Sequence, residues 1–348
     1  MNRKKIMIIG LECGGIPQSI AKAFRSIGWD AALFTYGAPR MNLLQLATLR
    51  VVDPHCDKIT RSTFNQCFRT GVFPELRRNR PDFLLVLKGD YFDDDVRDFL
   101  TRAEIPLVLW TFDSLFKAPA QRLLAEMAVH TFYVDGGDVP AGGYRSSWLP
   151  LGYDGDIYHP YPDIEKTIDV LLIGFIGIRY KRRRQIIDLL DESVLAQKWR
   201  CAFIGSTGTL MGNLSLQLHY GSAAHGRVTW LSRRIPPESL ALAIAKSKIC
   251  INIHQDDGIM PVNPMFFAIP ATGTCQLAEQ KPHLRQWLVP GRHYAEFTDG
   301  NFLEVLSGLL DDDKKRTSIV KNGIEACRDH TFISRVKSIV SVIERVSC

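Results

Sequence analysis

The first part of the chain alternates short apolar runs with segments of helical periodicity. KIMIIG, residues 5–10, is apolar, and residues 18–28 follow with apolar positions three or four apart. Further apolar runs lie at residues 30–36, 82–87, 106–110 and 130–134, and further helical patterns lie at 93–103 and 121–128. Strands that are apolar on both faces belong to parallel sheets covered by helices. The pattern predicts a doubly wound, Rossmann-like α/β domain over residues 1–150.

The same alternation restarts after a break. Residues 151–166 are rich in Pro, Asp and Tyr and lack periodicity, which is typical of a linker between domains. Residues 167–328 again alternate strand and helix patterns and predict a second Rossmann-like domain. Residues 329–348 have helical spacing and are a candidate for packing back across the domain junction.

Two parallel sheets bind ligands at the carboxyl ends of their strands. We therefore expect both domains to face one central cleft. Glycosyltransferases, some epimerases and periplasmic binding proteins share this arrangement, so the fold alone does not select a function.

Composition supports a globular protein of two domains. The chain has 348 residues, 46% of them hydrophobic and 23% charged. The formal net charge of +6 suits anionic ligands or an acidic membrane surface, but it is too small to indicate nucleic-acid binding by itself.

No targeting or metal-binding pattern stands out. Eight cysteines are scattered without a CxxC pair, so neither a zinc site nor a disulfide framework is signalled. The first apolar run is about five residues, shorter than the core of a signal peptide, and no segment approaches the roughly 18 apolar residues of a membrane span. We predict a cytoplasmic protein, with peripheral contact at the inner face of the membrane left open.

A glycine-bearing turn followed by cations comes after the apolar run at residues 168–173. Gly174 and Gly177 lie in this turn, and Arg179 and Arg183 lie in the basic run that enters the next helix. Glycine lets the backbone approach a phosphate group, and guanidinium groups bind phosphate in two-point contacts. Because residues four apart share a helix face, Arg179 and Arg183 are the candidate pair. The alternative is a solvated helix face or a patch for lipid headgroups.

A second anion-binding candidate is DGIMPVNPMFFAIPATGT, residues 257–274. Pro264 suits the first helical position, and Asn263 suits the capping position before it. The positive end of such a helix favours a phosphate group, whereas the alternative is a capped core helix without a ligand. His254 precedes this segment and is a candidate contact to the phosphate or sugar of a bound donor, although a single His is more often structural. No second His lies at metal-ligand spacing.

Three polar turns follow predicted strands of the first domain. Gly14 and Gly15 form the first turn, where backbone N–H groups are able to meet substrate oxygens or simply make a tight turn. Asp113 follows residues 106–110 and is either a base or a helix cap. Lys88 and Asp90 follow residues 82–87 and are candidates for substrate contact or for plain surface charge.

The order of these segments resembles the CgeB-type glycosyltransferases, relatives of the group 1 glycosyltransferases with the GT-B fold. The resemblance covers nearly the whole chain. It rests on RPDFLLVLKGDYF, IPLVLWTFDS, WLPLGYDGDIYHP, IDVLLIGFIGIRYKRRR, KSKICINIH, VNPMFFAIPATGT and LVPGRHYAEFTDGNFLEVL. It implies a GT-B fold, a nucleotide-sugar donor in the second domain and an acceptor in the first. It also implies catalysis without a metal, since basic side chains and a helix dipole stabilise the departing diphosphate.

The chain departs from the family at two acidic positions. Aligning the closing glycine on Gly273 places Phe267 on the family's Phe and Ala268 on the Glu that accepts hydrogen bonds from ribose. Met260 occupies the other acidic position of the motif. Three explanations stay open: Asp256 or Asp257 substitutes, phosphate contacts dominate donor binding, or transferase activity is lost.

The predicted function is a metal-independent glycosyltransferase of the hexosyltransferase type. It moves a sugar from a nucleoside-diphosphate sugar to a glycan, lipid-linked or protein acceptor, and it needs no further cofactor. Asp113 is the predicted catalytic residue, and the other predicted acceptor-side residues are Gly14, Gly15 and Lys88. The predicted donor-binding residues are Gly174, Gly177, Arg179, Arg183, His254, Asn263, Pro264 and Phe267.

Two other functions compete with this prediction. A catalytically silent nucleotide-sugar or glycan-binding protein of the same fold is favoured by Met260 and Ala268. Nucleic-acid binding through the basic run at residues 179–184 lacks the context of a binding fold.

Overall fold

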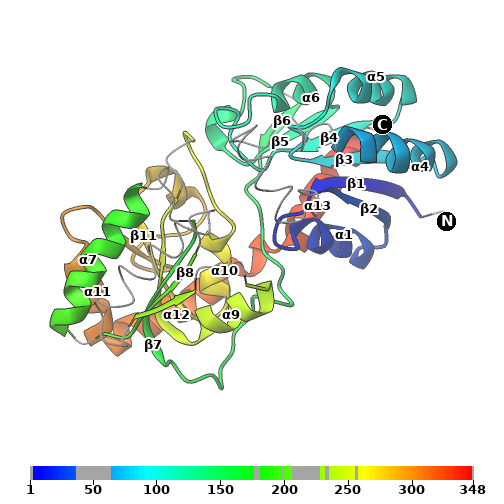
Figure 1. The fold of residues 1–348 in the computed structure, drawn as a ribbon. Helices are drawn as coiled ribbons and strands as arrows, with labels where there is room; N and C mark the ends of the chain where they lie inside the picture. Colours follow the sequence, from blue (N-terminus) through cyan, green and yellow to red (C-terminus); the bar gives the residue numbers. More distant parts are fainter. Residues whose placement is uncertain are drawn as a thin grey trace, which may run out of the picture. The chain divides into compact units, whose positions relative to one another are not determined.

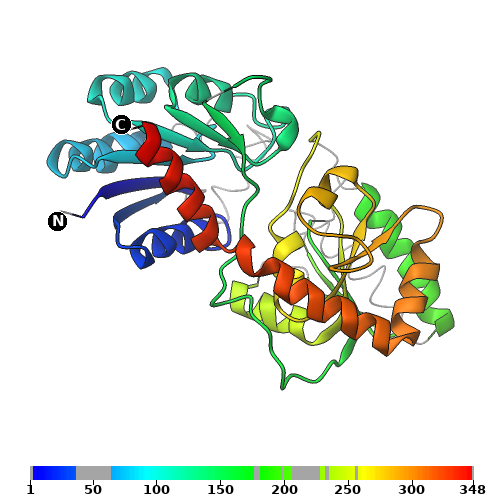
Figure 2. The same cartoon turned by 180° about the vertical axis from the view of Figure 1, so that it is seen from behind.

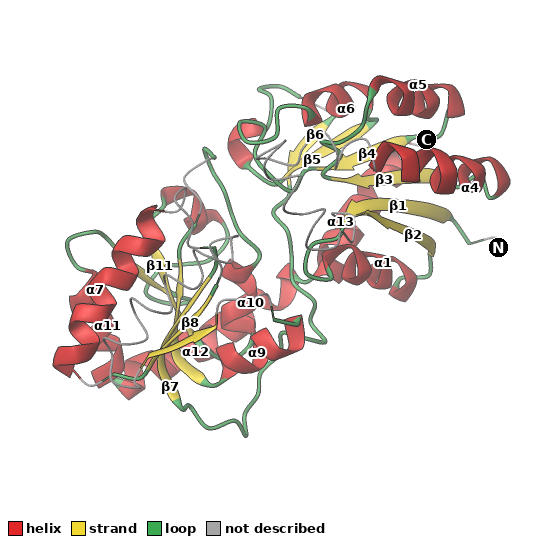
Figure 3. Cartoon of the chain, viewed as in Figure 1, coloured by secondary structure: helices red, strands yellow, loops and turns green. Residues whose placement is uncertain are grey.

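The protein is described by a computed structural model over residues 3–36, 64–143, 145–175, 181–197, 199–205, 228–231, 235–254 and 258–346. The chain forms two compact units. Unit 1 comprises Met1–Leu151, Asp256–Pro261 and Phe332–Cys348, and unit 2 comprises Gly152–Gln255 and Val262–Thr331. Each unit is a parallel sheet with helices on its faces (Figures 1 and 3).

Unit 1 contains a parallel sheet of six described strands. Their spatial order is β2 (Asp30–Tyr36), β1 (Lys5–Leu11), β3 (Phe83–Leu87), β4 (Leu107–Trp110), β5 (His130–Tyr133) and β6 (Ser146–Trp148). Every neighbouring pair in this order is parallel. All residues of β3 and β4 are buried, because a parallel sheet is covered on both faces.

Two hydrophobic layers enclose this sheet. Alternate residues of β3 serve the two layers: Phe83, Leu85 and Leu87 face one, and Leu84 and Val86 face the other. The first layer is built by α1 (Ile16–Ser26) and α13 (Phe332–Val346). The second is built by the π-helical turn Phe68–Val72, α4 (Phe73–Arg78), α5 (Asp94–Ala103) and α6 (Gln121–Met127). The end of the chain is thus part of the core of unit 1, and Figure 2 shows α13 beside α1.

Unit 2 contains a second parallel sheet of six described strands. Their spatial order is β12 (Ala295–Phe297), β11 (Cys275–Glu279), β10 (Ser247–Asn252), β7 (Ile168–Ile173), β8 (Cys201–Ile204) and β9 (Val228–Leu231). Its helices are α7 (Lys181–Gln197), α9 (Pro237–Ala245), α10 (Met265–Ala271), α11 (Phe302–Asp311) and α12 (Asp313–Cys327). Short 3-10 turns are Gly136–Asp138 in unit 1 and Pro282–Gln286 and Arg328–His330 in unit 2.

The strand order of each sheet reverses direction at one point. In unit 2 the chain adds β8 and β9 on one side of β7 and then β10, β11 and β12 on the other, so the order changes between β7 and β10. In unit 1 the change lies between β1 and β3. Parallel α/β sheets bind ligands at the carboxyl ends of the strands beside such a switch point.

The predicted fold class is confirmed, since both units are doubly wound and Rossmann-like. Within the described ranges, no helix has both the length and the apolar character of a membrane span.

Candidate functional site

In unit 2, Arg183 joins the two strands that flank the switch point. Its Nη1 donates to the carbonyl oxygen of Phe175, which follows β7, at 2.9 Å, and its Nη2 donates to that of Ile253, which follows β10, also at 2.9 Å. Gly174 has a φ of 135°, and a Cβ there would lie 2.9 Å from the guanidinium carbon of Arg183. Glycine is therefore required under the guanidinium group, and Arg183 fixes the shape of this edge.

His254 lies beside this arginine, directly after β10. Its residue surface is 2% exposed, its ring meets that of Phe266 edge to face at 5.5 Å between centroids, and neither ring nitrogen has a hydrogen-bond partner in the described structure. Burial, with help from the nearby charges of Lys281, His283 and Arg183, lowers the pKa of His254 to about 3. The imidazole is thus neutral near pH 7, with one donor and one acceptor that have no partner in the described structure.

Three further residues lie at this edge, at the end of β11 and directly after it, and none of them was predicted from the sequence. Lys281 and His283 lie within electrostatic reach of His254. Glu279 accepts a hydrogen bond from Nε of Arg182 at 2.8 Å, while its second carboxylate oxygen is buried and has no partner in the described structure. Their signal was the polar run EQKPH after the strand TCQLA. This polar run indicates a site only because β11 pairs with β10, which ends just before His254.

A closed ring of amide hydrogen bonds fixes the start of α10. Asn263 accepts from the backbone N–H of Phe266 at 3.1 Å and donates to Asn252 at 2.8 Å. Asn252 donates to Gln276 at 3.2 Å, and Gln276 donates back to the carbonyl oxygen of Phe266 at 3.2 Å. Asn263 therefore caps α10, while Pro264 lies at the N-cap position and the helix begins at Met265, one residue later than predicted.

The other motif positions of this helix are interior. Phe267 and Ala268 are each 0% exposed, and the Phe267 ring stacks on His330 at 4.3 Å between centroids. Phe267 therefore packs the core in this structure rather than lining an open surface. Met260 belongs to unit 1, where its backbone N–H donates to Asp135 at 2.7 Å. Of the remaining predicted residues, Gly177, Arg179, Asp256 and Asp257 lie outside the described residues.

In unit 1, the turn after β1 contains two glycines in the left-handed backbone conformation. Gly14 and Gly15 have φ of 58° and 77°, in the left-handed region. The backbone N–H of Gly15 donates to the Glu12 carboxylate at 3.3 Å. The amide predicted to meet a substrate oxygen thus has a carboxylate of the same turn as its acceptor.

Beside this turn, a cluster of four charged residues follows β3 and β4. The ammonium of Lys88 lies 3.0 Å from Oδ2 of Asp113 and 3.6 Å from Oδ2 of Asp90, and the Lys117 ammonium lies 2.8 Å from Oδ1 of Asp113. Burial alone would lower the pKa of Lys88, but Asp113 and Asp90 raise it. Burial tends to raise the pKa of Asp113, but the two ammonium groups hold it below its usual range. Burial raises the pKa of Asp90 more than Lys88 lowers it.

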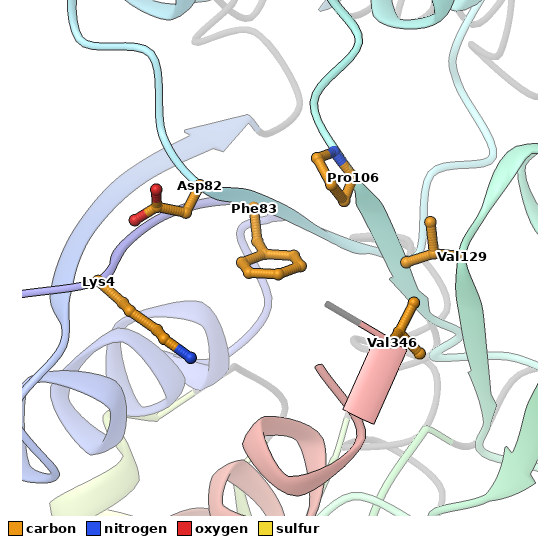
Figure 4. Close-up of a pocket in the computed structure, with 6 residues that line it drawn as sticks. All are labelled: Lys4, Asp82, Phe83, Pro106, Val129 and Val346. Atoms are coloured by element: carbon orange, nitrogen blue, oxygen red, sulfur yellow. The ribbon is translucent and has the colours of Figure 1, made fainter. Parts of the chain in front are cut away.

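Two pockets in unit 1 lie away from these carboxyl edges. One, of about 460 Å³, lies at the amino ends of β1, β3 and β4, against the end of α13 (Figure 4). It is lined by Lys4, Asp82, Phe83, Pro106, Val129 and Val346. The other, of about 640 Å³, lies at the ends of α4 and α5. Neither pocket contains a predicted site residue.

A family of known proteins matches the part of the chain that contains the edge of unit 2. Residues 182–341 match the family model described as glycosyl transferase-like. This part of the chain is therefore similar to glycosyl transferase-like proteins. It contains Arg183, His254, Asn263, Glu279 and Lys281, which carry the site of unit 2. The narrower CgeB-type resemblance stays a prediction.

Solved structures resemble the chain over nearly its full length. Sucrose-phosphate synthase from Thermosynechococcus elongatus is 14% identical with a TM-score of 0.70, covering 99% of both chains. HepE from Anabaena, in complex with UDP and glucose, is 13% identical with a TM-score of 0.67, covering 99% of this chain and 100% of that chain.

The fold also occurs outside glycosyl transferase-like proteins. A putative UDP-N-acetylglucosamine 2-epimerase from Listeria monocytogenes is 13% identical with a TM-score of 0.60, covering 99% of this chain and 98% of that chain. The comparison with curated proteins found no match. At these identities the likeness establishes the GT-B type of fold but not the activity, which has to be argued from the residues of the site.

Proposed function

We propose that the protein is a glycosyltransferase that transfers a hexose from a nucleoside-diphosphate sugar to a hydroxyl group of a glycan, lipid-linked or protein acceptor. The observation that carries this proposal is the set of side chains at the switch point of unit 2. Arg183, His254, Lys281 and His283 come from three different segments of the glycosyl transferase-like part of the chain. The cationic groups of Arg183 and Lys281 suit a diphosphate, since negative charge grows on this leaving group during sugar transfer.

The edge of unit 2 offers both kinds of contact that a nucleotide sugar requires. Lys281 supplies positive charge, and neutral His254 supplies a donor and an acceptor. Glu279 supplies a carboxylate oxygen without a partner in the described structure. We assign the ribose hydroxyls of the donor to Glu279 within this proposal, and diphosphate stabilisation to the cationic groups without a metal ion.

A uracil nucleotide is the first donor class to examine. HepE structures contain UDP and UDP-glucose, and a structure of MnaA from S. aureus contains UDP. These proteins share the fold at 12–14% identity, so their ligands supply a starting panel for this chain.

The second candidate is a nucleotide-sugar-binding protein without catalytic activity. The observation that favours it is the pair Met260 and Ala268, where the family resemblance places carboxylates. Binding without turnover is its expected signature.

The test is isothermal titration of the whole protein with UDP, GDP, dTDP and their glucose conjugates, with and without EDTA, followed by donor hydrolysis and transfer assays. We expect one nucleoside diphosphate to bind in EDTA and its sugar conjugate to turn over. Arg183→Ala is expected to raise the donor KM and lower kcat, whereas Arg184→Ala, at an exposed position of the same helix, leaves both unchanged.

Three outcomes contradict parts of the proposal. Binding without turnover with every acceptor supports the silent binding protein. Loss of turnover in EDTA, restored by a divalent cation, removes the metal-independent mechanism. No binding to any member of the panel removes the proposed function.

A further inference from the structure

The larger pocket of unit 1 is lined by arginine side chains that have no acidic partner. Its volume is about 640 Å³, which is within the range of sites for small molecules. Arg77, Arg80 and Arg102 line it, and all three are exposed. Within the ranges that the structure describes, none of their guanidinium groups forms an ion pair. Glu104 is the one carboxylate in the lining, so three positive charges face one negative charge there.

A carboxylate close to these arginines in the sequence has other partners. Glu75 accepts a hydrogen bond from the side chain of Asn79 and lies 3.6 Å from Nη2 of Arg78. In α5, Nε of Arg102 donates to the backbone carbonyl oxygen of Asp98 at 3.3 Å, and this bond does not use the Nη groups of the arginine. The pocket thus contains guanidinium donors that are available to an anion.

The same pocket has an apolar wall. Leu76 and Ile105 line it and are buried, and the half-buried ring of Phe99 lines it as well. The Phe99 ring stacks on Phe73 with 3.5 Å between centroids, and the guanidinium carbon of Arg77 lies 5.5 Å from the Phe99 centroid. Because a cation is attracted to an aromatic ring at this distance, Arg77 is held at the pocket without a ligand.

Helix ends offer a simpler explanation for some of this charge. Arg77 and Arg102 lie in the last turns of α4 and α5, where carbonyl oxygens attract cations. This explanation does not cover Arg80, which follows the end of α4 at Arg78. It also treats the two helices separately, whereas α4 and α5 cover the same face of the sheet and share one pocket (Figure 1). The three guanidinium groups in that pocket point to a ligand.

We propose that this pocket of unit 1 binds the phosphate group of a phosphate ester. Guanidinium groups bind phosphate oxygens in two-point contacts, and their charges are matched by the double negative charge of a phosphate monoester. The apolar wall of Leu76, Phe99 and Ile105 suits the organic part of the ester. A soluble phosphate ester and a lipid headgroup share this chemistry. The site has no residue in common with the edge of unit 2, and it does not depend on the proposed function.

The experiment records amide NMR spectra of the whole protein during the addition of inorganic phosphate, glycerol phosphate or, as a control anion, acetate. It compares the wild type with Arg77→Gln, Arg80→Gln, Glu104→Gln and the control Lys337→Gln, which removes a charge from an exposed position of α13. Flotation with vesicles of phosphatidylcholine, alone or mixed with phosphatidic acid, distinguishes the two sources of the phosphate group.

Phosphate and glycerol phosphate are expected to shift the amide signals of residues 76–80 and 99–105, and acetate is expected to bind more weakly. Arg77→Gln and Arg80→Gln are each expected to weaken phosphate binding about tenfold or more, since each removes a hydrogen bond between charged groups. Glu104→Gln is expected to tighten binding because it removes a like charge, and Lys337→Gln is expected to match the wild type.

Two results distinguish the sources. Retention on vesicles with phosphatidic acid that Arg77→Gln and Arg80→Gln abolish identifies a lipid headgroup. Binding of glycerol phosphate at residues 76–80 and 99–105 without retention on vesicles identifies a soluble phosphate ester.

Other results overturn the proposal. If millimolar phosphate leaves the signals of residues 76–80 and 99–105 unshifted, or if Arg77→Gln and Arg80→Gln bind as the wild type does, the arginines serve the helix ends alone. Equal weakening in Lys337→Gln, or acetate bound as tightly as phosphate, shows a general effect of charge and no site. Because the signals are read at these residues of unit 1, phosphate bound at the edge of unit 2 does not contribute to the result.

Discussion

Single residues in this protein show how position changes the role of a charge. The sequence pattern predicts that Arg183 binds phosphate. In the structure its guanidinium group donates hydrogen bonds to the carbonyl oxygens of Phe175 and Ile253. Arginine forms such two-point contacts because its donors lie in one rigid plane. After burial and the charges of Lys281 and His283, the charge of Arg183 also helps to lower the pKa of His254. Arg183 thus both shapes and charges the site.

The neutral state of His254 predicts a measurable sensitivity to acid. Its pKa is about 3 in the folded protein against an ordinary value of 6.5. Between these values the unfolded chain binds a proton that the native state excludes, so stability falls as the pH drops below 6.5. At pH 5 this single group costs about 2 kcal/mol relative to pH 7.

His254→Leu is expected to reduce the difference in unfolding free energy between pH 7 and pH 5 by about that amount, about 2 kcal/mol, measured by urea unfolding at pH 5, 6 and 7. His159→Leu replaces an exposed histidine and is expected to leave the pH dependence as it is in the wild type. Identical pH dependence in His254→Leu and the wild type would show that the buried imidazole does not titrate differently in the two states.

At the scale of elements, the amide ring connects α10 to β10 and β11. Each of its members uses a donor and an acceptor inside the ring, and Asn252 and Gln276 are 4% and 0% exposed. Satisfied polar networks hold buried elements in one arrangement, because any unpaired member incurs a desolvation cost. The ring thus ties the start of α10, a helix of seven residues, to both strands.

Asn252→Ala is expected to lower the free energy of unfolding by about 2–3 kcal/mol, since it removes the acceptor of the Asn263 amide N–H and the donor to the Gln276 carbonyl oxygen. The double variant Asn252→Ala/Gln276→Ala is expected to lose less than the sum of the single losses, as measured by chemical denaturation. Asn79→Ala, at an exposed helix end, is the control and is expected to lose less than about 0.5 kcal/mol. Additive losses in the double variant would show that the ring does not act as a unit.

At the scale of the whole molecule, the chain returns to its first unit at its end. Helix α13 follows α12 of unit 2 but contributes Val336, Ile339 and Ile343 to the core of unit 1. Arg335 of this helix donates to the carbonyl oxygen of Pro150 at 2.9 Å. Unit 1 therefore lacks part of its core until α13 has been synthesised.

Ile339→Asp is expected to destabilise unit 1 by about 4 kcal/mol or more, because it places an unpaired charge in a fully buried position. The measurement is limited proteolysis with mass spectrometry, in which peptides of unit 1 are expected to appear first, together with the loss of a calorimetric transition. Ile333→Asp changes a residue of the same helix that is 43% exposed and is expected to resemble the wild type. Equal proteolysis of both units in Ile339→Asp would show that α13 does not support unit 1 selectively.

Local pattern was sufficient for most of the elements, although not for α4 or β6, and it was not sufficient for the composition of the site. The strands at residues 82–87 and 106–110 were predicted because their apolar residues continue without interruption, as burial on both faces demands. Asn263 was predicted as a cap because its side chain and the amide it accepts from are three residues apart. Glu279, Lys281 and His283 were missed, since a polar run after a strand looks the same at any edge. Phe267 was predicted at the donor because motif alignment does not show which way a side chain points.

The sequence by itself determined two doubly wound units, because the period and length of apolar runs depend only on neighbouring residues. Tertiary structure decided which strands became neighbours, and this choice brought Arg183 to Ile253 and the EQKPH run to His254. It also decided that Asp113 holds two ammonium groups while Asp90 keeps an oxygen without a partner in the described structure. Such contacts depend on strand order, and strand order is set by the packing of the whole sheet rather than by any single segment.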